Sequence, residues 1–323
     1  MRSDVLELLR EAGGYISGEK MAERLGVTRA AVWKKIAALR DAGYDISSAP
    51  RSGYILRSAP DRLIEPEIAK GLGTELVGRK IICYDAVGST NLLLKDMARQ
   101  GAENGTVVVA DTQGMGRGRM ERAFFSPPGK GIYVSILLRP NFLPQDAPKC
   151  TLMAAVAVAR AMEKFGLRAA IKWPNDIMHD RRKMVGILTE MSAEMDRVNY
   201  VVIGIGINVN IASEDFPEEL RPIATSLMQM KGEPLPRVAF LQELLRALDA
   251  LYACAQQEGF APVLAAWREY AVTLGQQVRV IGPAGESFEG MAADIDAEGA
   301  LLIDTSTGRR RVLAGDVSIR PKE

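Results

Sequence analysis

The segment of the chain with the clearest capacity for chemistry runs from Gln113 to Arg119, with the sequence QGMGRGR. Its alternate glycines, Gly116 and Gly118 among them, let the backbone approach a ligand closely and point N–H groups toward an anion. Arg117 and Arg119 add two permanent charges whose forked donors suit phosphate or carboxylate groups. The spacing is neither GxGxxG nor GxxxxGK[ST], so it does not predict a Rossmann or P-loop nucleotide site. Taken alone, the segment is equally typical of a flexible RNA-binding or linker segment.

Three further segments hold polar groups beside apolar, strand-like stretches. Residues 172–176 (KWPND) bring together a cation, an amide and a carboxylate. Residues 183–188 (KMVGIL) place a lysine before an apolar run that contains Gly186, and residues 204–210 (GIGINVN) combine small residues with amides such as Asn208. Each segment is weak alone, because a lysine before a strand is usually solvated and a Gly-x-Gly strand often reflects close packing.

Several other chemistries are disfavoured by what the chain contains. The one histidine, His179, lies in an expected turn, so a Ser–His–Asp or Cys–His triad would depend on it alone. Cys83, Cys150 and Cys254 are far apart without a CxxC pair, which predicts free thiols in a reducing cytoplasm and no protein metal site. No apolar run approaches the roughly 18–20 residues of a membrane span. The first residues do not resemble a signal peptide, so we expect a soluble cytoplasmic protein with no membrane contact.

Length and charge set the domain count and limit the possible partners. At about 150 residues per domain, 323 residues indicate two or three domains. The composition, 47% hydrophobic and 25% charged, is that of an ordinary globular protein. Lys and Arg number 41 against 40 Asp and Glu, so the whole molecule has no field that attracts nucleic acid. A nucleic-acid hypothesis must therefore rest on local charge.

Residues 1–60 supply that local charge within a predicted winged helix-turn-helix. Apolar spacing predicts three short helices, the third capped by a threonine, followed by a β-hairpin whose turn carries an arginine. Residues 28–40, which span the third helix, contain four cations and no acid. A solvated basic face or a protein-binding winged helix remains an alternative. The residues predicted to bind DNA are Thr28, Arg29, Lys34, Lys35 and Arg51.

The rest of the chain predicts an α+β fold in two further domains. Strand-like and helix-like stretches alternate over residues 68–270, which indicates a mixed α/β domain with a large core. Residues 271–323 form short alternating strands divided by turns, as in a small SH3-like β-barrel. A stabilising appendage is at least as plausible for that tail as a direct catalytic role.

The motifs in their order along the chain closely resemble the biotin protein ligases. GSTN at residues 88–91 precedes QGMGRGR, KWPND, KMVGIL and GIGINVN at similar separations, and the winged helix adds a resemblance to the bifunctional repressor members of that family. The resemblance covers essentially the whole chain. It implies a catalytic domain at 68–270 with a biotin and adenylate site. The site residues that it implies are Ser89, Thr90, Asn91, Gln113, Gly116, Arg117, Gly118, Arg119, Lys172, Asn175, Lys183, Gly186 and Asn208.

The loop after Arg119 departs from the family's more basic pattern. It continues Met-Glu-Arg-Ala-Phe-Phe, with Phe124 where some relatives have tryptophan. The residue that stacks on adenine therefore stays open.

The resemblance implies a reaction in two steps. Biotin and MgATP give biotinyl-5′-AMP and pyrophosphate, and a lysine of a biotin carboxyl carrier protein then takes the biotinyl group. A carboxylate is already ionised at neutral pH, so this attack needs aligned charge rather than a histidine base. Arg117, Arg119 and Lys183 are the expected catalytic cations, and Asp176 is a candidate to orient or deprotonate the acceptor amine or else a structural turn residue.

Two alternatives of other classes stay open: a lipoate-type ligase, and a transcription factor that senses biotin without catalysis. For the repressor function, the resemblance implies that the adenylate favours a homodimer that binds the operator DNA of biotin genes. The apolar stretch 186–191 is a candidate edge for that dimer and otherwise an interior strand.

Overall fold

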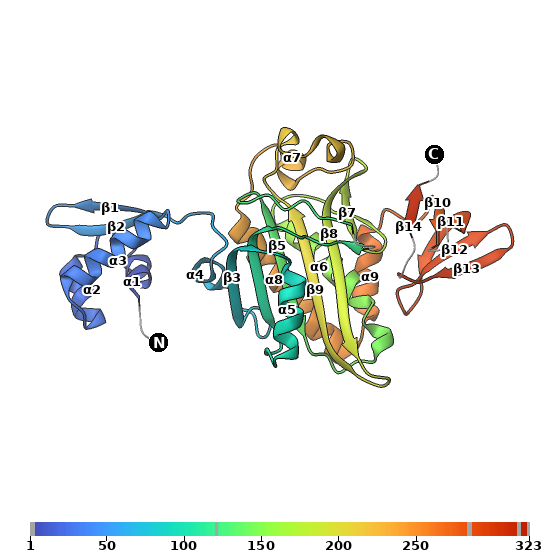
Figure 1. Cartoon of the computed structure of the whole chain (residues 1–323), viewed down its shortest axis with the longest axis horizontal. Helices are drawn as coiled ribbons and strands as arrows, with labels where there is room; N and C mark the ends of the chain where they lie inside the picture. The colour runs from blue at the N-terminus through green and yellow to red at the C-terminus, as the bar shows by residue number, and fades with distance from the viewer. Residues whose placement is uncertain (1–3, 120–121, 283–285, 315–317, 322–323) are drawn as a thin grey trace. The chain divides into compact units, whose positions relative to one another are not determined.

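The computed structural model describes residues 4–119, 122–282, 286–314 and 318–321. The chain forms two compact units, Met1–Arg62 and Leu63–Glu323. Their elements confirm the predicted α+β class (Figure 1). Among the described residues, no helix has the length and apolar character needed to cross a bilayer.

The first unit is the predicted winged helix-turn-helix. Three helices, α1 (Val5–Ala12), α2 (Gly18–Leu25) and α3 (Arg29–Asp41), precede a hairpin of β1 (Asp45–Ala49) and β2 (Gly53–Ser58). Gly26, at φ 65°, makes the left-handed turn between α2 and α3, where a side chain would be strained. Thr28 caps α3 as predicted, because its Oγ1 accepts a hydrogen bond from the backbone N–H of Ala31 at 3.2 Å.

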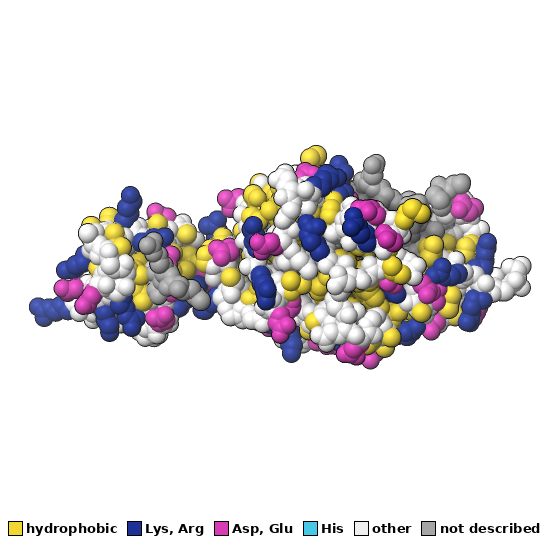
Figure 2. Space-filling view, turned by 90° about the horizontal axis from the view of Figure 1, so that it is seen from below, with side chains coloured by type: hydrophobic (Ala, Val, Ile, Leu, Met, Phe, Trp, Pro, Cys, Tyr) yellow, Lys and Arg dark blue, Asp and Glu magenta, His cyan; other side chains and the backbone are white. Residues whose placement is uncertain are grey.

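The second unit is built on a mixed seven-stranded sheet. Its strands are β3 (Lys80–Val87), β4 (Thr106–Gln113), β5 (Gly131–Leu138), β6 (Ala170–Lys172), β7 (Asp176–His179), β8 (Arg182–Ala193) and β9 (Val198–Asn208). They lie in the order β3-β4-β5-β9-β8-β7-β6, with β3 and β4 parallel and the other pairs antiparallel. Lys and Arg side chains mix with Asp and Glu over the face of this unit in Figure 2, in keeping with the near-zero net charge.

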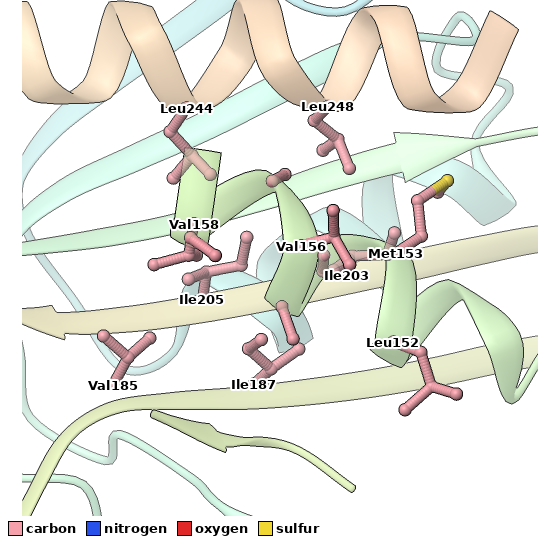
Figure 3. Packing of buried hydrophobic residues seen from close by; sticks show 14 of the residues in the cluster. Leu152, Met153, Val156, Val158, Val185, Ile187, Ile203, Ile205, Leu244 and Leu248 are labelled. Carbon is pink, nitrogen blue, oxygen red and sulfur yellow. The ribbon is translucent and has the colours of Figure 1, made fainter. Parts of the chain in front are cut away.

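Helices cover both faces of this sheet. On one face α6 (Lys149–Lys164) packs on β8 and β9 and is itself covered by α8 (Arg237–Glu258) and α9 (Ala261–Tyr270). Figure 3 shows side chains of α6 between those of the two strands and those of α8. On the other face α5 (Thr90–Arg99) packs on β4, β5 and β9. The short helices are α4 (Glu65–Ala69), α7 (Leu227–Lys231) and the 3₁₀ turns η2 (Pro144–Asp146), η3 (Ser213–Asp215) and η4 (Glu218–Leu220).

The alternation of side chains along β9 separates the core from the opposite face. Ile203 and Ile205 point into the main core with α6, whereas Gly204 and Gly206 fall on the α5 side. Beside the N-terminal end of α5, the space above these glycines is occupied by the side chain of Asn91 over Gly204 and by that of Phe124 over Gly206.

Between Gln277 and Pro321, the tail that was predicted to be a small SH3-like barrel forms a five-stranded antiparallel sheet. Its strands β10 (Gln277–Ile281), β11 (Ser287–Ile295), β12 (Leu301–Thr305), β13 (Gly308–Val312) and β14 (Ser318–Pro321) pair in the order β13-β12-β11-β10-β14. This sheet belongs to the same compact unit as the central sheet.

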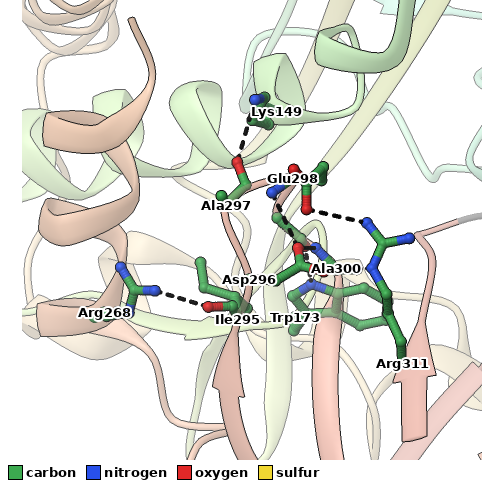
Figure 4. A network of polar contacts seen from close by, with 10 residues as sticks. Lys149, Trp173, Arg268, Ile295, Asp296, Ala297, Glu298, Ala300 and Arg311 are labelled. Atoms are coloured by element: carbon green, nitrogen blue, oxygen red, sulfur yellow. Dashed lines mark hydrogen bonds and ion pairs between the residues drawn. The ribbon is translucent and has the colours of Figure 1, made fainter.

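The C-terminal sheet is fixed to the central domain at the KWPND segment (Figure 4). Trp173 donates from its indole nitrogen to the Gly299 carbonyl at 3.1 Å and from its backbone N–H to Thr273 Oγ1 at 2.9 Å. Lys149 of α6 donates to the Ala297 carbonyl at 3.2 Å. These bonds place the turn between β11 and β12 directly against a predicted site segment.

Candidate functional site

Two adjoining hollows lie on the α5 side of the central sheet, where the predicted motifs meet. The first is lined by Ser89, Thr90, Asn91, Gln113, Arg117, Gly118, Phe124, Asn175, Lys183, Gly186, Ile187, Leu188, Gly204, Ile205 and Gly206. The second is lined by Gly118, Arg119, Arg122, Ala123, Phe124, Phe125, Lys172, Trp173, Pro174, Asn175, Asp176, Lys183, Asn208, Phe216, Leu220, Ile223 and Ala224. The residues common to both are Gly118, Phe124, Asn175 and Lys183. These four mark the border between the hollows.

The N-terminal end of α5 forms the polar wall of the first hollow. Gln113, the last residue of β4, accepts hydrogen bonds from the Thr90 backbone N–H at 2.9 Å and from Thr90 Oγ1 at 3.1 Å. Its amide nitrogen donates to Ser126 Oγ at 3.3 Å. Ser89 and Thr90 are almost completely buried in this wall. These hydrogen bonds thus connect the N-terminal end of α5 to the end of β4 beside the first hollow.

Asn91 is held within the wall by three partners. Its Oδ1 accepts from Ser135 Oγ at 2.6 Å, and its Nδ2 donates to the Leu188 carbonyl at 3.2 Å and to Glu190 Oε2 at 3.0 Å. A Cβ on Gly204 would lie 2.1 Å from Asn91 Oδ1, so this position tolerates only glycine while Asn91 keeps its place. The amide of Asn91 is therefore committed to the wall.

The Phe124 side chain lies between the two hollows and packs over two glycines of the sheet. Gly186 and Gly206 are cross-strand partners of β8 and β9. A Cβ on Gly206 would lie 2.6 Å from the Phe124 ring, and one on Gly186 would lie 3.2 Å from it. The ring also makes an edge contact with Tyr133, with ring centres 6.4 Å apart. The glycines of two predicted motifs thus provide the seat for an aromatic ring.

The glycine–arginine loop doubles back on itself. The N–H of Phe124 donates to the Gly116 carbonyl at 2.9 Å, and the N–H of Gly118 donates to the Arg122 carbonyl at 2.7 Å. Gly116 packs against its own loop, since a Cβ there would lie 2.6 Å from the Phe124 carbonyl oxygen. Gly116 lines neither hollow, unlike Gly118. Of the loop residues considered in the sequence, 120 and 121 lie outside the described part.

Of the predicted catalytic cations, Lys183 lies at the border of the hollows, and the two arginines line one hollow each. Lys183 Nζ lies 2.6 Å from Asp176 Oδ1, and both side chains are about one-third exposed or less. Arg119 donates to Asn175 Oδ1 at 3.2 Å and faces the second hollow, while Arg117 is exposed at the first. An anion bound at the border would meet Lys183 with its charge balanced by Asp176.

The KWPND segment is the turn of the β6–β7 hairpin, in which Lys172 and Asp176 are cross-strand partners. Asn175 is buried, and its Nδ2 donates to the Ile187 carbonyl at 2.9 Å. Asn208 is also buried and donates to the Thr225 carbonyl at 3.0 Å, so its amide supports the wall of the second hollow.

The sequence analysis missed the irregular stretch from Phe216 to Ala224, which covers the second hollow. This stretch is anchored on Lys183, whose N–H donates to the Ile223 carbonyl at 2.8 Å. Its residues carry no motif, and only apolar side chains within a polar loop hint at a lining role.

Two of the three cysteines are poorly suited to nucleophilic chemistry. Burial raises the pKa of the Cys150 thiol to about 12, and burial together with Glu65 raises the pKa of the Cys83 thiol to about 12. Both thiols therefore stay protonated at neutral pH and are poor nucleophiles. No group of three potential metal-ligating side chains occurs in the ranges that the structure describes.

In the first unit, the predicted DNA-binding residues fall into two groups. Arg29 and Arg51 line a hollow between α3 and the hairpin, beside the exposed Trp33, and Lys34 is exposed on α3. By contrast, Lys35 lies 3.6 Å from Asp4, and Thr28 is occupied as a helix cap.

Comparison with known proteins gives consistent matches over the whole chain. Residues 84–208 match the model of the biotin/lipoate A/B protein ligase family, residues 2–55 match an HTH domain, and residues 273–320 match the biotin protein ligase C-terminal domain. The chain is 44% identical to the bifunctional ligase/repressor BirA of Bacillus subtilis over 99% of this chain and 98% of that protein. Its identity to the Escherichia coli protein of the same name is 33%, over 96% and 95%.

Among solved structures, the fold is similar to a biotin protein ligase from Aquifex aeolicus in complex with biotin and ATP. The TM-score is 0.67 at 28% identity, and the match covers 76% of this chain and 100% of that one.

Proposed function

This chain belongs to the biotin protein ligase family, in its bifunctional ligase/repressor branch, and from that premise we propose how its two units divide the work. Residues 68–270 activate biotin with MgATP and transfer it to a lysine of a biotin carboxyl carrier protein. Residues 1–60 bind operator DNA, and residues 271–323 support the catalytic domain.

The observation that carries the ligase function is the shared border of the two hollows. A condensation of biotin with ATP needs the carboxylate of one substrate to meet the α-phosphorus of the other. Lys183 and Asn175 line both hollows, and Arg117 and Arg119 face one hollow each. Biotin in the first hollow and ATP in the second would bring the two reacting groups together among these cations.

In the first step a carboxylate oxygen of biotin attacks the α-phosphorus, and the bond to pyrophosphate breaks. Lys183, Arg117 and Arg119 offset the negative charge of the two substrates as they approach. Mg²⁺ arrives with the ATP phosphates as part of that substrate. Among the described residues, Asp176 is the one carboxylate that lines either hollow.

In the second step the amine of the acceptor lysine attacks the carbonyl carbon of the mixed anhydride, and AMP leaves. The amine must lose a proton to attack. Asp176 faces the second hollow and becomes available once Lys183 turns to the adenylate, so we assign to it the orientation of the incoming amine.

Pyrophosphate release with biotin or lipoate as the acid tests the proposal. We expect release with biotin alone, which separates this function from a lipoate-type ligase and from a non-catalytic sensor. Lys183→Ala should reduce release by about 10²–10³-fold, the usual cost of one charge-stabilising group. Lys231→Ala is the matched control, because Lys231 pairs with Glu233 at 3.0 Å and lines neither hollow. Full activity in a folded Lys183→Ala protein would contradict the proposal.

Repression requires that the ligand site and DNA binding be linked, and we assign that link to a homodimer. Beyond residue 187, β8 pairs with β9 on one side, and no described strand pairs with its outer edge. Met191 on that stretch is 49% exposed. An unpaired strand edge is able to extend a sheet into a second copy. Adenylate that binds the dimer better than the monomer would increase operator binding by the same factor.

Sedimentation and gel-shift measurements with and without biotin and ATP test this link. The apo protein is expected to be mainly monomeric and to bind biotin-gene promoters weakly. Arg29→Ala should lower operator affinity and reduce the salt slope by about 1. Arg24→Ala is the control, because it removes a cation of α2 that is paired with Glu11 of α1. Equal operator affinity with and without adenylate would refute the link.

A further inference from the structure

An ion pair outside both hollows is connected to the first one through Asn91. Lys95, one turn along α5 from Asn91, lies 2.5 Å from Glu190 Oε1 on β8. Both side chains are partly buried, at 22% and 28% exposure. Neither residue lines either hollow. The other carboxylate oxygen of Glu190 accepts the hydrogen bond from Asn91 Nδ2 at 3.0 Å.

From Asn91 the hydrogen bonds continue along the wall of the first hollow. Ser135, fully buried in β5, shares its one hydroxyl hydrogen between Asn91 Oδ1 at 2.6 Å and Thr90 Oγ1 at 2.8 Å. Thr90 in turn donates to Gln113 at the end of β4. A continuous polar path thus joins a charged pair near the surface to the residues that face the hollow.

The charge of Glu190 reinforces the orientation of the Asn91 amide, whose Nδ2 also donates to the Leu188 carbonyl. A carboxylate is an acceptor only, so it pairs with the NH₂ group of Asn91 and leaves the carbonyl oxygen for Ser135. A hydrogen bond to an ionised acceptor is roughly twice as strong as a neutral one. Lys95 holds this carboxylate in place and balances its charge.

We propose that Glu190 and Lys95 are positioning residues for the biotin site. They reinforce the orientation of the Asn91 amide and, through Ser135, that of the Thr90 hydroxyl that faces the first hollow. This inference rests on the proposed binding of biotin in that hollow. The path touches neither Lys183 nor Arg119, so its contribution falls on biotin binding and not on charge compensation at the border.

Steady-state kinetics of the full chain, measured as pyrophosphate release with MgATP, test the assignment. Glu190→Gln and Lys95→Met should each raise the KM for biotin by about tenfold, while kcat and the KM for ATP change less than about twofold. Asp96→Asn is the matched control on the same helix. It breaks the exposed Asp96–Arg99 pair, at 2.8 Å, and should leave all three constants unchanged.

A double-mutant cycle tests whether Glu190 acts through Asn91. In an Asn91→Ala protein, whose biotin KM is already raised, adding Glu190→Gln should have less than about a twofold further effect. A full tenfold effect in that background would overturn the assignment. So would a Glu190→Gln protein that melts earlier but keeps its biotin KM, or one in which both substrate KM values rise together.

If Glu190→Gln does not fold, the Lys95→Met protein carries the same comparison. If the wild-type chain releases no pyrophosphate with biotin, the proposed function itself fails. If the wild type is active and the variants keep its biotin KM, only the roles assigned to Glu190 and Lys95 fail.

Discussion

Two glycines on β9 provide a matched pair of perturbations with different expected results. Gly204→Ala would place a Cβ 2.1 Å from Asn91 Oδ1, 2.7 Å from its Cγ and 2.9 Å from its Nδ2. Asn91 is 5% exposed, so it cannot make room without leaving its partners. Two neutral hydrogen bonds, from Ser135 and to the Leu188 carbonyl, and one charge-assisted bond would be lost or strained.

The cost of Gly204→Ala follows from these bonds. A neutral bond contributes about 0.5–1.5 kcal/mol and a charge-assisted one about 1.5–3 kcal/mol. The reduced freedom of the unfolded chain returns about 0.4–1 kcal/mol. The expected loss in the free energy of unfolding is therefore about 2–5 kcal/mol, which corresponds to a fall in Tm of about 5–15 °C for a unit of this size.

Gly206→Ala, two residues along the same face, meets a different neighbour. Its Cβ would lie 2.6 Å from the Phe124 ring, which is the far end of a partly exposed loop side chain. The ring can swing away without breaking any hydrogen bond of the first hollow. We expect a Tm within about 3 °C of the wild type and a smaller loss of biotin affinity than in Gly204→Ala, because Gly206 and Phe124 line the first hollow but the hydrogen bonds of Asn91 stay intact. The KM for ATP should also rise, because Phe124 lies at the border between the hollows.

Differential scanning calorimetry and titration calorimetry with biotin make the comparison. Gly204→Ala should melt earlier and bind biotin at least about tenfold more weakly, which corresponds to 1.4 kcal/mol. Gly206→Ala serves as the control for adding a methyl group to this face of β9. Equal behaviour of the two variants would refute the reasoning, because it would mean that Asn91 is not the neighbour that matters.

Three further predictions concern other parts of the chain. Arg119→Gly removes a charged contact of about 1.5–3 kcal/mol, so the adenylate should escape and label bystander proteins. Mass spectrometry that finds no more labelling than with the wild type would contradict this prediction. Trp33 is 63% exposed and the other two tryptophans are buried, so acrylamide should quench mainly the fluorescence of Trp33. Operator DNA should protect Trp33 from this quenching. If DNA does not reduce the quenching, the face of α3 that carries Trp33 does not contact the DNA. The hydrogen bond from Arg309 lowers the pKa of Asp304, so its stabilisation is present above the ordinary Asp pKa and is lost as the pH falls through the lower value in the folded protein. Asp304→Asn should therefore reduce Tm at pH 7 more than at pH 2.5, and a larger difference in acid would contradict it.

Much of the fold and of the site was predictable because the signals are local. Thr28 caps α3 because a threonine directly before a helix accepts a hydrogen bond from one of its first free N–H groups, here that of Ala31. The KWPND and KMVGIL motifs meet because KWPND forms the β6–β7 turn and β7 pairs with the first half of β8, which holds KMVGIL. Asp176 starts β7 and Lys183 lies near the start of β8, and the pairing of the two strands brings their side chains to 2.6 Å.

What the sequence did not indicate depends on strand register and on distant partners. Ser135 lies within an apolar run of β5 and has no local signal. Its role follows from its pairing with Gly204, which puts both beside Asn91. In the same way, Lys35 of α3 pairs with Asp4, which is the N-cap residue of α1. Such contacts are set by tertiary packing, which motif spacing does not encode.

The position of Trp173 explains why a small C-terminal sheet belongs to the catalytic unit. The turn that contains Asn175 is held on one side by β8, where Asn175 exchanges hydrogen bonds with the backbone of Ile187. On the other side Trp173 is held by Thr273 and Gly299. A site that acts by alignment of charge rather than by a nucleophile depends on such fixed positions, because a small displacement of the cations weakens the stabilisation of the reacting groups. We therefore infer that the C-terminal sheet acts on the site by holding the KWPND turn in place, since none of its described residues lines either hollow.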